Sequence, residues 1–288
     1  MTESEILSRI ASKAGVSSRL VHGIGDDCAV YRPEAGEDLV YTTDFLIEDI
    51  HFRHDTHTPS DIGRKCLARG LSDIAAMGAT PLFCLLSLAL PSWAGKRFVN
   101  AFYSGFLAQA RLHSTLLAGG DLAHAPLVIC DVVVCGSVPR GRALLRSGAK
   151  AGDAIYVSGK LGRAAVSGYT AAIKPRLALG RYLRGIASAA MDLSDGLSQD
   201  LTRLAIASGV SAVLDSPVPA ALNATEPQAL HGGEDYELLF TAPPATTLPP
   251  IHEGVPITRI GTMIKRTKHT ILYRGQPLVA AGYDHFRK

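Results

Sequence analysis

The sequence lacks the features that mark secreted, disulfide-rich and membrane-spanning proteins. Its five cysteines are odd in number and include no Cys-x-x-Cys pair, so we expect reduced thiols in the core. The longest apolar run, residues 82–90, is far shorter than the roughly 20 residues that a membrane span needs. Residues 1–15 carry early acidic side chains and no apolar core of a signal peptide. These absences predict a cytoplasmic protein with no membrane partner.

Motifs of common nucleotide-binding and hydrolytic enzymes are also missing. Gly159 and Lys160 resemble the end of a Walker A loop, but Ala154 stands at the place of its first glycine and Leu161 replaces the Ser or Thr. No Gly-x-Gly-x-x-Gly follows a predicted strand, and the protein-kinase signatures and the Gly-x-Ser-x-Gly elbow are absent. A nucleotide site in this chain must therefore be built from other residues.

Neither sign of charge dominates the chain. Lys and Arg total 29 against 26 Asp and Glu, which gives a net charge of +3. The one notable basic cluster, at residues 259–268, has no interleaved aromatic residues, so it predicts a solvated hairpin and no nucleic-acid partner. His51, His54 and His57 recur every third residue, but the helical i, i+4 histidine pair and the cysteine pair of zinc sites are absent. We therefore expect no zinc.

Length and composition predict two folded domains. The chain has 288 residues, of which 47% are hydrophobic and 19% charged, enough for substantial buried cores. Strand-like and helix-like runs alternate along it, which indicates two α/β (α+β) units. We expect helices near 60–77 and 197–207, and strands near 40–44, 81–91, 115–118, 127–138, 153–158 and 236–241. A boundary at 139–141 divides the chain into an N-terminal domain, 1–139, and a C-terminal domain, 140–288.

Aspartates gather where the predicted helices and strands end, most of them beside Gly, Ser or Thr. Glycine lets a backbone approach phosphate oxygens, and carboxylates hold the magnesium ions that neutralise those oxygens. Aspartate also caps helices and fills turns, so a structural role stays open for each position. Thr42 and Thr43 add hydroxyls at the end of the strand 40–44. Together these positions predict a magnesium and polyphosphate site that draws on Asp26, Asp27, Asp44, Asp73, Asp121, Asp192 and Asp195.

A set of short motifs extends from residue 23 to residue 286. In order they are Gly-Ile-Gly-Asp-Asp-Cys-Ala (23–29), Thr-Thr-Asp with the later His-Phe (42–52), Leu-Ser-Asp-Ile-Ala-Ala-Met-Gly-Ala (71–79), Gly-Gly-Asp (119–121), Arg-Ser-Gly-Ala-Lys-Ala-Gly-Asp (146–153), Asp-Leu-Ser-Asp-Gly-Leu (192–197), Gly-Gly-Glu-Asp-Tyr-Glu-Leu (232–238) and Gly-Tyr-Asp-His-Phe (282–286). As an ordered set they resemble the thiamine-monophosphate kinase family, within the aminoimidazole-ribonucleotide synthetase superfamily.

The resemblance implies a two-domain fold of the aminoimidazole-ribonucleotide synthetase type. In that family the N-terminal sheets of two subunits pack into a homodimer, and ATP lies in a cleft between the domains. The resemblance also implies direct transfer of the γ-phosphate of ATP to thiamine monophosphate, assisted by several Mg²⁺ ions, with thiamine diphosphate as the product. Because the acceptor phosphate is already a charged nucleophile, no covalent or general-base residue is required.

The same resemblance assigns roles to individual residues. The metal positions are Asp27, Thr42, Thr43, Asp44, Asp73, Asp121, Asp192 and Asp195. The ATP positions are Gly120, Asp121, Arg146 and Ser194, with Tyr103 as a further candidate for packing on the nucleotide. The thiamine-phosphate positions are His51, Glu234 and Tyr283. An aromatic ring at Tyr283 suits stacking on a cationic thiazolium, and Glu234 suits pairing with the aminopyrimidine or the cation.

Some features depart from the family pattern or leave alternatives open. Segments 166–175 and 217–231 look shorter than is usual in the family. Asp26 adjoins Asp27, and we favour Asp27 as the metal ligand. The competing functions are another ATP-dependent enzyme of the superfamily and a non-catalytic protein that binds nucleotide or thiamine phosphate.

Overall fold

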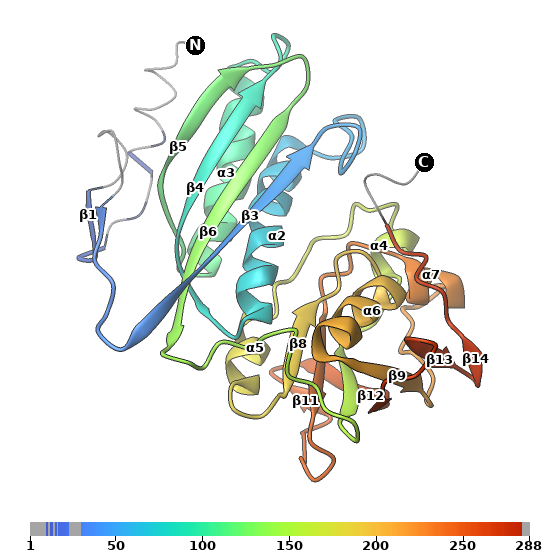
Figure 1. Cartoon of the computed structure of the whole chain (residues 1–288). Coiled ribbons are helices and arrows are strands. Elements are labelled where there is room, and N and C mark those ends of the chain that lie inside the picture. Colours follow the sequence, from blue (N-terminus) through green and yellow to red (C-terminus); the bar gives the residue numbers. More distant parts are fainter. Residues whose placement is uncertain (1–9, 11, 14, 16, 23–29, 284–288) are drawn as a thin grey trace. The chain divides into compact units, whose positions relative to one another are not determined.

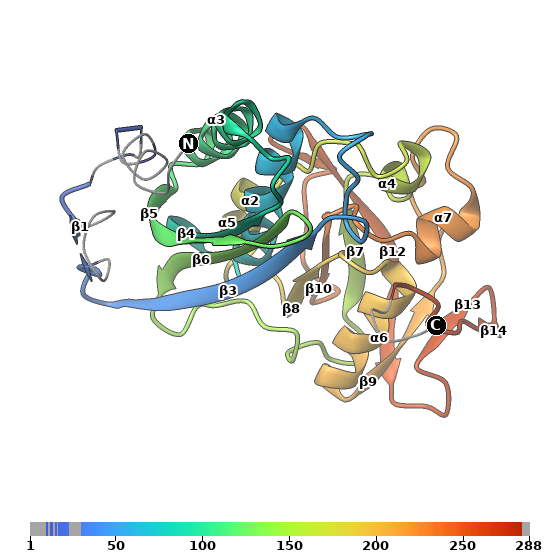
Figure 2. The same cartoon turned by 90° about the horizontal axis from the view of Figure 1, so that it is seen from above.

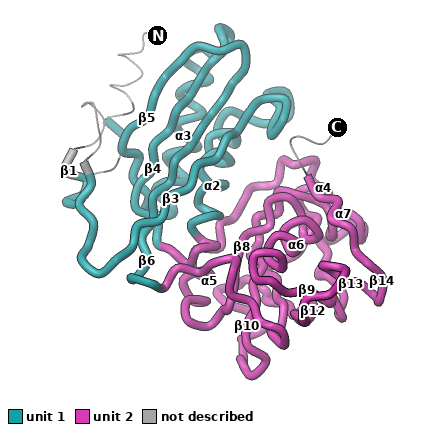
Figure 3. The backbone as a smooth tube through the Cα atoms, viewed as in Figure 1, with its two compact units in different colours: residues 1–74, 80–141 teal, residues 75–79, 142–288 magenta. Residues whose placement is uncertain are grey.

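The computed structural model of the chain describes all residues except 1–9, 11, 14, 16, 23–29 and 284–288. It forms two compact units, coloured separately in Figure 3. Unit 1 contains residues 1–74 and 80–141, and unit 2 contains residues 75–79 and 142–288. The position of Asp27 and the end of the last motif lie outside the described residues. The chain passes from unit 1 to unit 2 between residues 141 and 142, and residues 75–79 also belong to unit 2.

Unit 1 is built on a four-stranded sheet in the order β3-β6-β4-β5. Its strands are β3 (Glu37–Ile47), β4 (Thr80–Leu90), β5 (Leu116–His124) and β6 (Ile129–Pro139), and its helices are α2 (Pro59–Ala76) and α3 (Lys96–Leu112). Figure 2 shows both helices on the same side of this sheet. Apolar residues recur along α2 at helical spacing, and Ile62, Cys66, Leu71 and Ile74 are all buried. This apolar stripe fixes which side of α2 faces the sheet.

The two helices of unit 1 approach each other closely at glycines. An added Cβ at Gly63 of α2 would collide with the carbonyl oxygen of Phe102, and one at Gly105 of α3 would collide with that of Ser60. The phenyl ring of Phe102 stacks at 6.3 Å from that of Phe106 along α3. Glycine at these two positions is therefore what allows the backbones to pack without intervening side chains.

The other face of the sheet in unit 1 is only partly covered. Strands β1 (Leu20–His22) and β2 (Val30–Tyr31) pair with each other, and Leu20 and Tyr31 pack on a small cluster around Phe83 and Cys135. Farther along β3, Tyr41 is 61% exposed and Phe45 is 56% exposed. These two aromatic side chains leave an apolar surface on unit 1 that no described residue of this unit buries.

Unit 2 contains a mostly antiparallel sheet in the order β14-β13-β9-β12-β7-β10-β8, with β11 paired to β12. Figure 1 labels the strands of this sheet other than β7 and β10. The strands are β7 (Ala154–Ser158), β8 (Ala189–Asp192), β9 (Val210–Leu214), β10 (Leu238–Ala242), β11 (Ile251–His252), β12 (Val255–Lys265), β13 (Ile271–Tyr273) and β14 (Gln276–Pro277). The helices are α4 (Arg163–Val166), α5 (Leu177–Leu183), α6 (Leu197–Ser208) and α7 (Glu226–His231). Leu197, Leu201 and Leu204 of α6 pack into the core of this sheet.

Most predicted elements are present, with two informative differences. The Gly-Gly-Asp motif was expected to follow a strand, but it lies inside β5, which continues to His124. The segment 217–231, where no helix was predicted, contains α7, which begins with a reciprocal capping box between Thr225 and Gln228. The capping pair is visible in the sequence, whereas the continuation of β5 depends on its pairing with β4.

The cysteines of the described residues agree with the expectation of reduced thiols in the core. Cys66, Cys84, Cys130 and Cys135 are buried and free of disulfides, and Cys28 lies outside the described residues. Within the described part of the chain, no helix combines the length and the apolar character that a membrane crossing requires.

Substitution Gly105→Ala tests the close contact between α2 and α3. The new methyl group has no room, so the free energy of unfolding should fall by about 1–3 kcal/mol, as is typical of overpacked cores. Trp93, the single tryptophan, contacts Phe98 with ring centroids 5.3 Å apart, so its fluorescence reports the urea unfolding of unit 1. The exposed neighbour Ser104→Ala is the control, with an expected change below about 0.5 kcal/mol. Equal stability of both variants would contradict the contact.

Candidate functional site

Acidic side chains of β3 and α2 meet on the helix-covered face of the sheet in unit 1. Thr42 and Asp44 lie two residues apart in β3, so they point to the same face. Arg69 and Asp73 lie four residues apart in α2, so they share one side of the helix. The Thr42 hydroxyl donates to Asp73 Oδ2, and an Arg69 Nη2–H donates to Asp44 Oδ1 at 3.1 Å. The structure thus brings together three of the predicted metal positions, with an arginine beside them.

The environment of Asp44 disfavours its negative charge. The pKa of Asp44 is raised to about 6. Burial is the largest cause, Arg69 lowers the pKa, and the neighbouring carboxylates of Asp73 and Asp131 raise it. Arg69 therefore only partly offsets the effect of burial on Asp44. A divalent cation among these oxygens would favour the ionised carboxylate, which makes this donor set chemically suited to Mg²⁺.

Two other predicted metal positions lie on the opposite face of the same sheet. Thr43 is adjacent to Asp44 in β3, so its side chain points away from α2, and its hydroxyl donates to Asp131 Oδ1 at 2.5 Å. Ser87 of β4 is paired both with Asp131 of β6 and with Asp121 of β5. Paired residues of neighbouring strands share a face, so Asp121 lies on the Thr43 side. The predicted metal positions among the described residues of unit 1 therefore lie on both faces of the sheet.

Gly120 occupies a position in β5 that only glycine fits. Its φ is +152°, and an added Cβ would collide with the carbonyl oxygen of Leu86. The register between β4 and β5 shifts just before this point. Asp121, next to Gly120, is exposed, and its Oδ1 accepts a hydrogen bond from the Leu122 N–H at 2.9 Å.

In unit 2 the predicted residues gather around the loop that joins β8 to α6. Asp192 ends β8 and is buried. The Asp195 carboxylate accepts a hydrogen bond from Arg203, which also donates to Asp200 Oδ1 at 2.9 Å. Burial raises the pKa of Asp200 to about 6. Arg203 and Asp200 were not predicted, although Asp200 and Arg203 are three residues apart on α6, a spacing that can be seen in the sequence.

Backbone hydrogen bonds bring two substrate candidates to the same loop. The Glu234 N–H donates to the Ser194 carbonyl at 2.7 Å, and the Tyr283 N–H donates to the Asp195 carbonyl at 3.0 Å. Glu234 has a φ of +64°, an unfavourable conformation for a residue other than glycine. The side chain of Tyr283 is 46% exposed. Ser194, Asp195, Glu234 and Tyr283 thus form one cluster, and the backbone strain at Glu234 is of the kind that collects at functional sites.

The remaining predicted residues have distinct environments. His51 is buried, and its Nδ1 accepts a hydrogen bond from the Ile47 N–H at 3.0 Å, so the ring proton resides on Nε2 in the neutral form. Tyr103 is buried in α3, and burial raises the pKa of its hydroxyl. Little of the Tyr103 ring is therefore available for packing on a nucleotide. Arg146 is exposed at the start of unit 2.

No metal cluster is complete in the part of the chain that the structure describes. The described residues contain no group of three or more His, Cys, Asp or Glu side chains arranged to hold an ion. Asp27 lies outside the described residues. The expected magnesium sites therefore stay a prediction, supported by the donor chemistry at Asp44.

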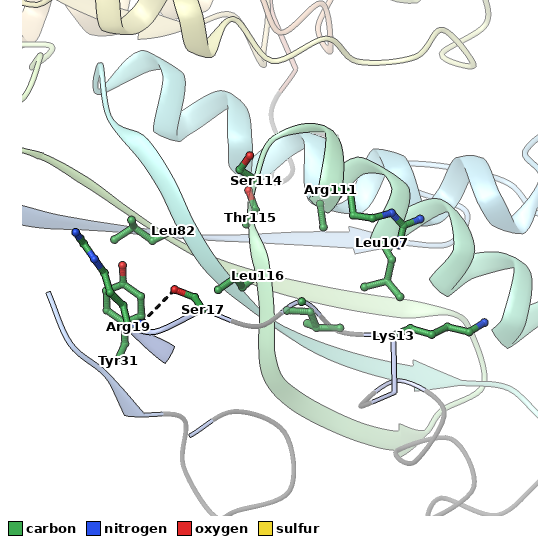
Figure 4. Close-up of a pocket in the computed structure, with 13 residues that line it drawn as sticks. Lys13, Ser17, Arg19, Tyr31, Leu82, Leu107, Arg111, Ser114, Thr115 and Leu116 are labelled. Atoms are coloured by element: carbon green, nitrogen blue, oxygen red, sulfur yellow. Dashed lines mark hydrogen bonds between the residues drawn. The ribbon is translucent and has the colours of Figure 1, made fainter. Parts of the chain in front are cut away.

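A cavity of about 480 Å³ in unit 1 involves other residues (Figure 4). It is lined by Lys13, Arg19, Tyr31, Leu107, Arg111 and Leu116, among others. None of the predicted site residues lines it. The Arg19 N–H donates to Ser17 Oγ at 3.2 Å along its wall.

The chain is similar in sequence and in structure to known proteins. The family model "AIR synthase related protein, N-terminal domain" matches residues 25–138. The chain is 33% identical to the thiamine-monophosphate kinase of Bacillus subtilis (strain 168), with full coverage of both sequences. It superposes on the thiamine-monophosphate kinase of Stenotrophomonas maltophilia K279a with a TM-score of 0.84 and 36% identity, covering 96% of this chain and 98% of the other.

A solved structure of a relative includes ligands. The structure of AaThiL complexed with AMPPCP and TMP matches with a TM-score of 0.79 and 26% identity, covering 88% of this chain and 89% of that one. The fold is accordingly that of the aminoimidazole-ribonucleotide synthetase type. On this identity and coverage, the chain belongs to the thiamine-monophosphate kinase family.

Proposed function

We propose that this kinase transfers the γ-phosphate of ATP directly to thiamine monophosphate, which gives thiamine diphosphate. The observation that carries the proposal is the meeting of Thr42, Asp44 and Asp73 on one face of the sheet, in a chain whose relatives are thiamine-monophosphate kinases. Phosphoryl transfer depends mainly on positioning and on neutralising charge, so acidic residues that hold cations can supply much of the catalysis.

Mg²⁺ ions, when bound, would neutralise the phosphate oxygens and hold the donor and acceptor in line. In unit 1 the candidates to hold them are Thr42, Asp44 and Asp73, and in unit 2 they are Asp192 and Asp195. Arg69 keeps the Asp44 carboxylate oriented through its hydrogen bond of 3.1 Å. We also retain Asp27, Thr43 and Asp121 as proposed metal positions, and Gly120, Asp121, Arg146 and Ser194 as proposed ATP positions.

Thiamine monophosphate would be recognised by His51, Glu234 and Tyr283. The exposed ring of Tyr283 offers a surface for the cationic thiazolium, and the Glu234 carboxylate offers a partner for the aminopyrimidine. His51 presents an Nε2–H donor, because its Nδ1 is occupied by the Ile47 amide. This tautomer suits the binding of an anion and does not suit a general base.

The direct test incubates the purified chain with ATP, Mg²⁺ and thiamine monophosphate and quantifies thiamine diphosphate. Free thiamine serves as the control acceptor. We expect product from the monophosphate alone and none when EDTA removes the metal. ATP binding without product would instead favour a sister enzyme of the superfamily or a non-catalytic binding protein.

Asp44→Asn is expected to reduce turnover by at least about a hundredfold, because the amide keeps the shape of the carboxylate but removes the charge that holds the cation. Circular dichroism and the urea midpoint should match those of the unmodified chain. Asp215→Asn is the matched control, since Asp215 is an exposed acid paired with Arg259 outside all the motifs. Normal turnover of the Asp44 variant would contradict the assignment of this residue.

We further propose that the partly uncovered sheet face of unit 1 forms the homodimer expected from the family resemblance. Tyr41 and Phe45 are the exposed apolar side chains on it, and a charge placed there would have to be buried without a partner. Phe45→Asp should therefore raise the dimer dissociation constant by at least about tenfold. Sedimentation equilibrium measures this constant, and Leu112→Asp, at an exposed site on α3, is the control. A monomeric unmodified chain would refute the proposal.

A further inference from the structure

A second cavity, of about 430 Å³, lies within unit 2. It is bordered by the Gly-Lys pair that follows β7, by α4, by the segment before α5 and by residues 221–222. None of the residues assigned to metal, ATP or thiamine phosphate lines it. Its size is in the range of small-ligand pockets, which begin at about 300 Å³. The proposed kinase function therefore leaves this cavity unexplained.

Positive charge dominates the lining of this cavity. Its cationic side chains are Lys160, Arg163, Lys174 and Arg176. Its single carboxylate belongs to Glu237, which is buried and already accepts hydrogen bonds from Arg176 Nε at 2.7 Å and from Ser158 Oγ at 2.5 Å. The charge of Glu237 is thus matched by Arg176. The other three cations are left in excess within the lining.

The two lysines in the lining of the cavity are available to a ligand. Lys160 and Lys174 are both exposed, and neither forms an ion pair with any residue that the structure describes. Arg163 uses one Nη2–H to bind the Ala172 carbonyl at 2.9 Å, which leaves its other guanidinium donors for further contacts. Clustered cations repel one another, and a bound anion would relieve this repulsion.

The loop that bears these cations is held in place by buried acids. The Asp235 carboxylate accepts hydrogen bonds from the N–H groups of Gly162 and Ala164, the second at 2.9 Å. Gly159 has a φ of +61°, and a Cβ there would collide with the Glu237 carboxylate. Lys160 and Arg163 therefore project from a loop with little freedom, so binding would not have to order it.

We propose that this cavity binds a small phosphate-bearing anion with more than one negative charge, of about the size of a diphosphate. Arginine offers a planar set of donors that fits phosphate oxygens, and lysine adds a mobile point charge. The cavity is concave and its lining includes no aromatic residue for base stacking, which favours a small molecule over a nucleic acid. Val166 and Leu222 give it an apolar border suited to an organic substituent.

The test measures the binding of inorganic pyrophosphate by isothermal titration calorimetry. EDTA is included, so that the acidic sites cannot retain pyrophosphate through a divalent metal. The double variant Lys160→Ala/Lys174→Ala should bind pyrophosphate at least about tenfold more weakly than the unmodified chain. The control Lys265→Ala/Lys268→Ala also removes two positive charges, here from exposed residues where β12 ends and the connection to β13 begins, and should change the dissociation constant by less than about twofold.

Three outcomes would overturn the proposal. They are absence of pyrophosphate binding to the unmodified chain, equal weakening in both double variants, and orthophosphate binding as tight as that of pyrophosphate. The substituted lysines are exposed, so both variants should fold, and matching circular dichroism spectra check this. Because neither lysine belongs to the proposed kinase site, the kinase assay and this titration can fail independently.

Discussion

The close approach of α2 to its sheet is the constraint on which the acidic cluster of unit 1 depends. Gly70 makes it possible, because an added Cβ at this position would lie 2.7 Å from Val134 Cγ2. Arg69 and Asp73 flank Gly70 on the helix, and at this separation they reach Asp44 and Thr42. A longer side chain at Gly70 would move the helix outward and separate the two pairs. The charge pattern of the candidate site thus follows from packing.

Sequence periodicity predicts part of this site and misses the rest for a definite reason. Alternation along β3 places Thr42 and Asp44 on one face, and helical spacing identifies the buried side of α2. The direction of Asp121, by contrast, depends on the register of β5 against β4, which shifts near Gly119. A shift of one residue reverses the face of every following side chain. The strand pairing seen in the structure is therefore needed to establish that the side chains of Asp121 and Asp44 point to opposite faces.

The three acids of the motif 232–238 illustrate the same limit in unit 2. Glu234 is partly exposed in a left-handed conformation, Asp235 accepts hydrogen bonds from the loop before α4, and Glu237 pairs with Arg176. The sequence alone does not distinguish these three carboxylates, which lie within four consecutive positions. Burial and partners divide them into one acid that can face a substrate and two that hold the surrounding backbone. The family resemblance selects Glu234, and the structure supplies a physical reason for that choice.

Unmatched charge is the common property of the two regions discussed for ligands. Around Asp44, carboxylates outnumber the one guanidinium, and burial is the largest cause of the raised pKa of Asp44. Around Lys160, cations outnumber the one carboxylate, because Arg176 already neutralises Glu237. Like charges held together cost folding free energy unless an opposite charge joins them. Such an imbalance has no structural benefit of its own, so a ligand of opposite sign is its simplest physical explanation: a divalent cation in the first region and a phosphate-bearing anion in the second.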